Sequence, residues 1–249
     1  MGSESNWRQE TAEQIKRAWR SEKKSWQEVD SVSYNVYRRG LEYVEALGGL
    51  SRTIEYINTQ FPNMPILDIG AGSTRGIAEV QRCFFPFNEP WGTVLSRPYP
   101  STSYSRLPAD KVVFTPAETL HGLHRKTKDS PSQFALVTGV MSTTYSMAPE
   151  QVVKAISKII PEGGVVKFTL YTATNWFGSA ELNAYDYYPI FTKAGFGTAY
   201  LCGIPYFENS VDVLLAVKGA SDEVVKQLIN GDFEYRENDK RQIRAETGY

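Results

Sequence analysis

A carboxylate followed by two glycines is the part of this sequence best suited to chemistry. Asp68 ends the short apolar run 65–67 and is followed by Gly70 and Gly72. Glycines let a backbone turn sharply and approach a ligand without a Cβ in the way. A helix starting at Thr74 would add N–H groups that lack intrahelical acceptors. The pattern predicts a ligand loop in which Asp68 holds a cationic amine, directly or through water; the alternative is an ordinary strand-to-helix turn.

Aromatic side chains follow two predicted strands, at the ends where open α/β sheets bind ligands. Tyr145 comes after the apolar run around 135–137, and Tyr171 ends the run that starts at 165. An aromatic group at 175–177 and three tyrosines within 185–188 come shortly after. Aromatic rings line binding clefts as readily as they pack in cores. Tyr145 and Tyr171 are therefore candidate catalytic residues of an acceptor pocket, with packing beneath a helix and the final hairpin as the alternative.

The two histidines, His121 and His124, lie three residues apart after the third predicted strand. A metal site would need further carboxylate or thiolate ligands beside them, and the sequence offers none that can be located. Cys83 and Cys202 fit neither a metal spacing nor a disulfide framework. We predict no metal site and interpret the histidines as surface residues, while His121 stays a candidate general base.

Strands alternate with helices through the middle of the chain. Short apolar runs lie at 65–69, 93–95, 112–114, 135–137 and 165–170, and helical patterns lie at 74–84 and 149–160. Such alternation predicts a parallel sheet covered by helices on both faces. Residues 197–204 and 211–217 predict an antiparallel pair, with a turn near 205–210.

The two ends of the chain read differently from the middle. Helices are predicted around 7–26, at 34–47 and at 51–60, the last with Ser51 as its N-cap. A short helix is predicted at 223–230, followed by a frayed tail from 234 to 249. We therefore expect three parts: an N-terminal helical extension or lid at 1–53, an α/β domain at 54–220, and a C-terminal helix and tail at 221–249.

Five segments in this order resemble the class I S-adenosylmethionine-dependent methyltransferases. They are LDIGAGSTRG at 67–76, AETL at 117–120, FALVTGVMSTTY at 134–145, IIPEGGVVKFTLY at 159–171 and FTKAGF at 191–196. The glycine-rich segment is the most specific, and the others are informative mainly through their order. The resemblance covers roughly residues 54–219 and implies a Rossmann-like seven-stranded sheet with one antiparallel strand. It also implies S-adenosylmethionine as the cofactor.

The resemblance assigns roles to residues at three places. Around the methionine part of the cofactor it places Asp68, Gly70, Ala71, Gly72 and Thr74. The backbone of Ala117 would face the adenine ring, and Gly139 with Val140 would line the open side of the cofactor.

The sequence departs from the family pattern where the nucleoside would bind. The family usually has an acidic residue after the second strand, gripping the ribose hydroxyls, whereas Ser96 and Arg97 follow here. Pro116 stands where an acid often contacts the adenine amino group. A hydrogen bond to a charged group contributes roughly 1.5–3 kcal/mol, so these losses weaken binding unless Ser96, Arg97 or Glu118 replaces them.

Function is expected to be methyl transfer to a small molecule, with a catalytically inactive methyltransferase-like scaffold as the alternative. A dinucleotide enzyme is disfavoured because the third glycine of its phosphate loop falls on Arg75. A protein acceptor stays open, and so does a homo-oligomer. The net charge of −1 and pI near 6.2 disfavour a nucleic-acid acceptor and an anionic membrane surface. The N-terminus lacks a signal-peptide pattern and no apolar run reaches membrane-spanning length, so a cytoplasmic protein is expected.

Overall fold

A computed structural model describes residues 39–94, 107–115, 117–123, 129–143, 146, 148–172, 182–206 and 209–248. The predicted helix around 7–26 and the candidate residues Ser96, Arg97 and Tyr145 lie outside these ranges. The elements along the chain are α3 (Gly40–Ala46), α4 (Ser51–Gln60), β1 (Ile66–Asp68), α5 (Arg75–Phe84), β2 (Pro90–Val94), η1 (Ala109–Lys111), β3 (Val112–Phe114), η2 (Ala117–Gly122), β4 (Leu136–Val140), α7 (Pro149–Ile159), β5 (Val165–Tyr171), α8 (Ala184–Lys193), β6 (Phe196–Tyr206), β7 (Asn209–Lys218) and α9 (Asp222–Thr247).

The strands form one seven-stranded sheet in the order β3-β2-β1-β4-β5-β7-β6. All neighbours are parallel except β7, which runs antiparallel to both β5 and β6. The predicted fold class is therefore confirmed, including the single antiparallel strand. After β3 the chain crosses back to place β4 on the other side of β1, so the order of the strands reverses between β1 and β4. Ligands of open α/β sheets bind at this reversal, beyond the carboxyl ends of the strands.

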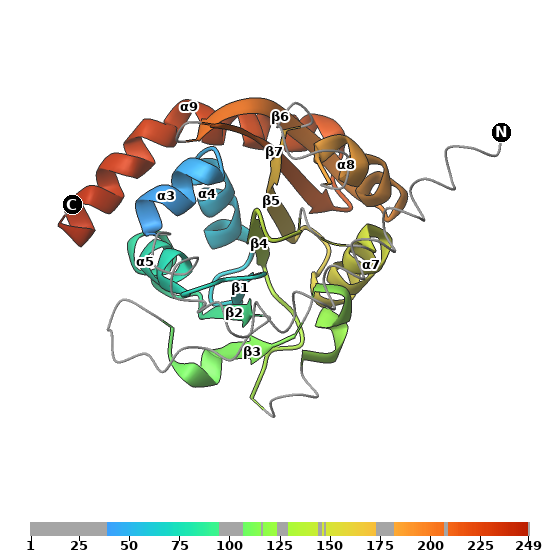
Figure 1. Ribbon diagram of the computed structural model, residues 1–249, viewed down its shortest axis with the longest axis horizontal. Coiled ribbons are helices and arrows are strands. Elements are labelled where there is room, and N and C mark those ends of the chain that lie inside the picture. The colour runs from blue at the N-terminus through green and yellow to red at the C-terminus, as the bar shows by residue number, and fades with distance from the viewer. Residues whose placement is uncertain are drawn as a thin grey trace.

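Helices cover both faces of the sheet (Figure 1). Helices α3, α4, α5 and α9 lie on one face, and η2, α7 and α8 lie on the other. Because successive side chains of a strand point to opposite faces, Ile66 and Leu136 join the core under the first group. Leu67 and Val137, one residue along, join the core under the second group. The fully buried strands explain why their sequences are nearly continuous apolar runs.

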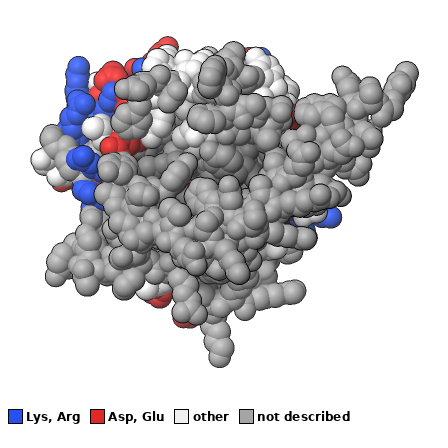
Figure 2. Space-filling model, viewed as in Figure 1, with Lys and Arg blue, Asp and Glu red and all other residues white. Residues whose placement is uncertain are grey.

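The predicted frayed tail is wrong. Residues 222–247 form one 26-residue helix, α9, which begins at a Ser221 N-cap and ends at Gly248 in the left-handed conformation. Its buried side has the spacing of one helical face and consists of Val225, Ile229, Asp232, Asp239 and Ile243. Two of these positions are aspartates, so the apolar periodicity that would reveal the helix is hidden. The outer side carries mixed charges, visible at the edge of the molecule where α9 ends (Figure 2).

Buried aspartates of α9 cap the start of α4. Ser51 is the first helical residue rather than the predicted N-cap, and Leu50 at the N-cap has no side-chain cap. Asp239 accepts from the backbone N–H of Leu50 at 2.7 Å and of Ser51 at 3.2 Å. Asp232 accepts from the next two backbone N–H groups, those of Arg52 and Thr53. The cap is thus supplied from almost 190 residues along the chain, where no local sequence pattern could show it.

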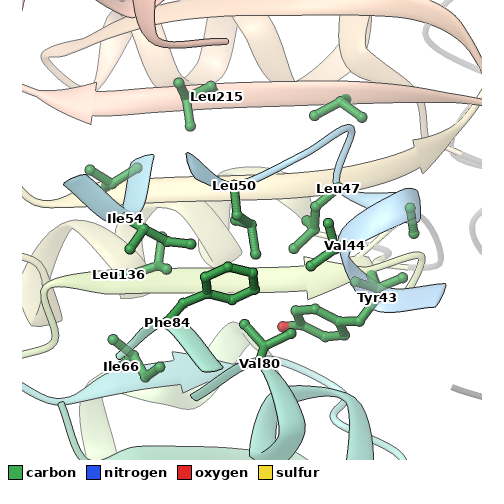
Figure 3. Close-up of a cluster of buried hydrophobic side chains, with 14 of the residues drawn as sticks. Tyr43, Val44, Leu47, Leu50, Ile54, Ile66, Val80, Phe84, Leu136 and Leu215 are labelled. Carbon is green, nitrogen blue, oxygen red and sulfur yellow. The ribbon is translucent and has the colours of Figure 1, made fainter. Parts of the chain in front are cut away.

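Between these helices and the sheet, most of the buried side chains are apolar (Figure 3). Side chains of α3 and α4 meet strand residues and α5 in one cluster that includes Val44, Leu47, Leu50, Ile54, Ile66, Val80, Phe84, Leu136 and Leu215. Burying a side chain of this size stabilises a fold by roughly 1.5–3 kcal/mol. Helix α3 falls within the segment expected as an extension or lid, yet Tyr43, Val44, Ala46 and Leu47 are core residues.

Candidate functional site

The candidate site lies at the carboxyl ends of β1 and β4, where the strand order reverses. Asp68 is the last residue of β1 and is 3% exposed. It pairs in register with Thr138 of β4, whose hydroxyl donates to Asp68 Oδ1 at 3.1 Å. The carboxylate therefore sits at the reversal itself, at the point where the glycine loop leaves the sheet.

The loop after Asp68 is fixed to β2 by its backbone. Gly70 N–H donates to Thr93 Oγ1 at 3.1 Å, and Ala71 N–H donates to Thr93 O at 2.8 Å. Ala71 packs so tightly against β2 that a Cβ on Gly92 would lie 2.9 Å from its methyl group. These contacts hold the loop over the end of β2, so its path is set by the protein before any ligand binds.

Gly70 makes room for Ser142, a residue of the loop after β4. A Cβ at this position would lie 2.4 Å from Ser142 Cβ, and Gly70 also has a φ of +65°. The Ser142 hydroxyl donates to Ile69 O at 2.5 Å. The resemblance placed Gly70 beside the cofactor, and on the side where its Cβ would project the space is occupied by Ser142. The most accessible residue of the loop is Gly72, which is exposed and has a φ of +54°, whereas Gly70, Ala71 and Ser73 are half-buried.

Thr74 adopts a backbone conformation that β-branched residues avoid. It is the N-cap of α5, with a φ of +62°. Its hydroxyl accepts from Leu107 N–H at 3.0 Å, and the residue is 4% exposed. Residues held in this region cost on the order of 1–3 kcal/mol and concentrate at ligand sites. Met141, just after β4, has a φ of +59°, so non-glycine residues of this kind flank the reversal on both sides.

The resemblance placed Gly139 and Val140 along the cofactor, but both lie inside β4. Val140 is 2% exposed and belongs to the core on the α3 side. A Cβ on Gly139 would lie 3.2 Å from the ring of Phe168. The residues at the rim are instead Met141, Ser142 and Thr143, which follow β4.

A second cluster of polar side chains lies beyond the end of β4. Ser146 donates to Glu118 Oε1 at 2.8 Å, and the Tyr187 hydroxyl donates to Thr143 O at 2.8 Å. Burial raises the pKa of Tyr187, so it is a neutral phenol. The Thr143 hydroxyl is buried and has no hydrogen-bond partner among the described residues. Glu118, which follows Ala117 in η2, thus contacts the segment after β4.

The tyrosines of α8 divide between packing and exposure. Tyr187 is fully buried and meets Phe168 edge to face at 5.7 Å. Tyr188 donates to Asp222 at 3.2 Å, beside the hairpin. Tyr185 is 56% exposed and contacts Tyr200 at 5.1 Å, and its pKa is raised to about 12, chiefly by the hydrogen bond with Cys202. Tyr187 is thus a packing residue, whereas Tyr185 is exposed and contacts β6.

The remaining candidate residues lie at the end of β5 and in η2. Tyr171 is half-buried at the end of β5, opposite Val211 of β7. His121 belongs to η2, and its side chain lies outside what the structure describes. Within the described ranges no three His, Cys, Asp or Glu side chains come together as metal ligands would. Nor does any described helix combine the length and apolar character needed to cross a bilayer.

Sequence reasoning missed two residues next to Asp68. The Tyr43 hydroxyl of α3 lies 2.5 Å from Thr138 Oγ1, which in turn lies 3.1 Å from Asp68. The three residues are between 1% and 3% exposed. Tyr43 lies 95 residues before Thr138, so no local spacing could reveal the contact. Figure 3 shows Tyr43 at the edge of the apolar cluster, between the ribbons of α3 and α5.

The described residues fit S-adenosylmethionine at its amino-acid end. Asp68 would supply a carboxylate for an ammonium group, and the exposed Gly72 lies four residues along. Helix α5 begins there; its N-cap residue Thr74 makes no side-chain cap, Ser73 Oγ accepts from Arg75 N–H at 3.4 Å, and the first turn has no acidic residue. At the ribose end, β2 stops at Val94 and carries no carboxylate within its described residues.

No family model and no curated protein matches the sequence. Similar solved structures include a 1,6-didemethyltoxoflavin-N1-methyltransferase from Burkholderia thailandensis with bound 1,6-didemethyltoxoflavin and S-adenosylhomocysteine, at 11% identity and a TM-score of 0.49 over 88% of this chain and 92% of that one. Another is a magnesium protoporphyrin IX methyltransferase from Synechocystis PCC 6803, at 10% identity and a TM-score of 0.45 over 68% of this chain and 81% of that one. Similarity at this level does not assign an activity.

Proposed function

We propose that the protein is an S-adenosylmethionine-dependent methyltransferase acting on a small molecule. The observation that carries the proposal is the position of Asp68 and its glycine loop, at the strand reversal of a β3-β2-β1-β4-β5-β7-β6 sheet. That position is where sheets of this kind bind ligands. The loop is preformed by Thr93 and Ser142, so little ordering would be needed on binding.

Each part of the site has a separate task in this proposal. The cofactor, when bound, supplies a methyl group already activated by a sulfonium, so no strong base is required. Asp68 would hold the amine and Gly72 would border the amino-acid end with its backbone. Glu118, in place of the missing acid before η2, would lie on the nucleoside side. The acceptor would enter beyond β4 and β5, where Tyr171 is half-buried, while the exposed Tyr185 contacts Tyr200 of β6.

Calorimetric titration tests the proposal. We expect one-site binding of S-adenosylmethionine and of S-adenosylhomocysteine, and no binding of NAD. Asp68→Asn keeps the shape of the side chain and removes its charge, so it should weaken both. Asp110→Asn is the matched control, because Asp110 is exposed on η1. Absence of heat with both nucleosides at millimolar concentration would contradict the proposal.

A non-catalytic methyltransferase-like scaffold is the second candidate. It is favoured by two observations: Ser142 fills the space over Gly70, and β2 ends at Val94 without a described carboxylate. This candidate predicts no heat with either nucleoside, and it predicts that a second protein co-purifies with the chain. A mass spectrum of the native protein separates the two functions, since co-purified cofactor is expected only for the methyltransferase.

A further inference from the structure

We propose that Tyr43 and Thr138 are positioning residues for Asp68, which they hold in the orientation that receives the amine of the cofactor. The inference rests on the proposed function and adds to it a contribution from α3. The two hydroxyls and the carboxylate form one buried series, with 2.5 Å from Tyr43 to Thr138 and 3.1 Å from Thr138 to Asp68. Neither α3 nor Thr138 was among the residues to which the sequence resemblance gave a role.

The Thr138 hydroxyl has more than one place to direct its proton. Besides Asp68 at 3.1 Å, it lies 3.3 Å from Leu67 O. A Tyr43 hydroxyl that donates to Thr138 Oγ1 occupies a lone pair of that oxygen and leaves the Thr138 proton for the sheet side. Buried hydrogen bonds in series also polarise one another, which strengthens the bond to the carboxylate. Tyr43 thereby excludes the state in which Thr138 donates to Tyr43, and it leaves Asp68 and Leu67 O as the acceptors of the Thr138 proton.

Tyr43 is itself held from several sides. Its ring packs on the first turn of α5 so closely that a Cβ at Gly76 would lie 2.8 Å from Tyr43 Cδ2. At the start of α3, Gly40 N–H donates to the buried Glu79 at 2.6 Å. At the end of α3, Ala46 O accepts from the Thr169 hydroxyl at 2.8 Å. A side chain fixed in this way places its hydroxyl with the precision that a supporting group of a binding site needs.

The same contacts join α3 to the glycine loop. Tyr43 touches Gly76 in the helix that the loop leads into, and it reaches Asp68 through Thr138, where the loop begins. The amino-acid end of the cofactor would therefore be sensitive to the Tyr43 hydroxyl, while the adenosine end, farther from this series, would not. This difference separates a positioning role from a general contribution to stability.

The test compares two nucleosides on the intact protein by calorimetry. S-adenosylhomocysteine carries the amine, and methylthioadenosine lacks the whole amino-acid group. Tyr43→Phe and Thr138→Val should each weaken S-adenosylhomocysteine about tenfold, the size expected when a supporting hydrogen bond is lost. Both should leave methylthioadenosine unchanged. The double variant should bind like the weaker single variant, because the two residues act in series.

Two controls keep the result interpretable. Tyr56→Phe removes a hydroxyl from α4, away from Asp68, and should change neither affinity. Thr138→Ser keeps the hydroxyl and should bind S-adenosylhomocysteine as tightly as the unaltered protein. If Tyr43→Phe does not fold, the comparison of Thr138→Val with Thr138→Ser tests the positioning role. Equal loss of both nucleosides, or no change in either, would overturn the positioning role. Failure of the unaltered protein to bind any nucleoside would instead refute the proposed function.

Discussion

Two groups of buried carboxylates in this protein have different surroundings. At the seam of α4 and α9, Asp232 accepts from Arg52 N–H, Thr53 N–H and Lys167 Nζ at 2.6–2.9 Å. At the end of β1, Asp68 accepts from a threonine hydroxyl and adjoins a glycine loop. The first carboxylate is surrounded by a helix terminus and a buried cation, which are structural partners. The second lies where the backbone bends and an exposed glycine follows, which is the arrangement expected of a ligand site.

The backbone around the two groups differs in the same sense. Helices α4 and α9 have regular conformations where they meet. The reversal between β1 and β4 is flanked by Thr74 and Met141, both with positive φ. Strained conformations persist only where the surrounding structure enforces them, and they cluster at functional sites. Burial of a carboxylate thus says little about its role until its partners and its backbone are considered together.

The largest effect should follow from breaking the seam. Asp232→Ala leaves Lys167 buried without its carboxylate, 2.6 Å away in the native protein, and strips acceptors from α4. Removing one partner of a buried pair costs about 3–5 kcal/mol of unfolding free energy. Urea unfolding measures it. Glu55→Gln, which breaks an exposed pair with Arg52, should leave the midpoint unchanged. A loss under about 1 kcal/mol for Asp232→Ala would contradict a structural role.

At Asp68, substitution should affect ligand binding strongly and the free energy of unfolding only slightly. Asp68→Asn should change unfolding only slightly while weakening S-adenosylhomocysteine by roughly 10- to 100-fold, the equivalent of one charge-assisted hydrogen bond. The ligand-induced rise in unfolding midpoint reports both quantities in one experiment. If Asp68→Asn destabilised the free protein as much as Asp232→Ala does, the distinction between the two groups would fail.

The contribution of the α4–α9 seam to stability should also depend on pH. Burial raises the pKa of Asp239, so protonation favours the folded state. The resulting stability is fully present below the unfolded pKa of about 3.9 and is lost as pH rises through the higher folded pKa. Relative to Asp239→Asn, the unaltered protein should therefore lose unfolding free energy between acidic and neutral pH. Urea titrations of both proteins across this range measure the difference. Parallel pH profiles would show that Asp239 ionises as it does in the unfolded chain.

The smallest effect concerns the strained loop. Thr74→Gly relieves the positive φ but loses the hydrogen bond from Leu107, whereas Thr74→Ala loses the bond and keeps the strain. The free energy of unfolding of Thr74→Gly should therefore be about 1 kcal/mol higher than that of Thr74→Ala. Thermal unfolding of the two variants provides the comparison. Alanine equal to or better than glycine would mean that the left-handed conformation at Thr74 carries no strain.

Much of the fold could be predicted because its signals are local. This holds for the strand at 65–69, the helix at 149–160 and the loop between Asp68 and Thr74. The residues that signal each of these elements lie within a few positions of one another. Helix α9 could not be predicted, since Asp232 and Asp239 interrupt its buried stripe. Their partners on α4 are 179 to 189 residues away, so their burial has no local signature.

The candidate site was predictable in its first residue and not in its surroundings. Asp68 follows from an apolar strand ending in a charge before glycines. Ser142 over Gly70, and Tyr43 behind Thr138, depend on how β4 and α3 pack against β1, which strand order alone does not specify. A glycine in such a loop can therefore make room for a serine of the same chain where sequence reasoning expects a ligand.

Hydrogen exchange with and without S-adenosylhomocysteine tests the central claim most directly. The account predicts slower exchange in the loop from Ile69 to Arg75 and in α3 when the nucleoside is bound, with no change at the seam of α4 and α9. Protection confined to another part of the molecule, or none at saturating nucleoside, would contradict a cofactor site at the end of β1.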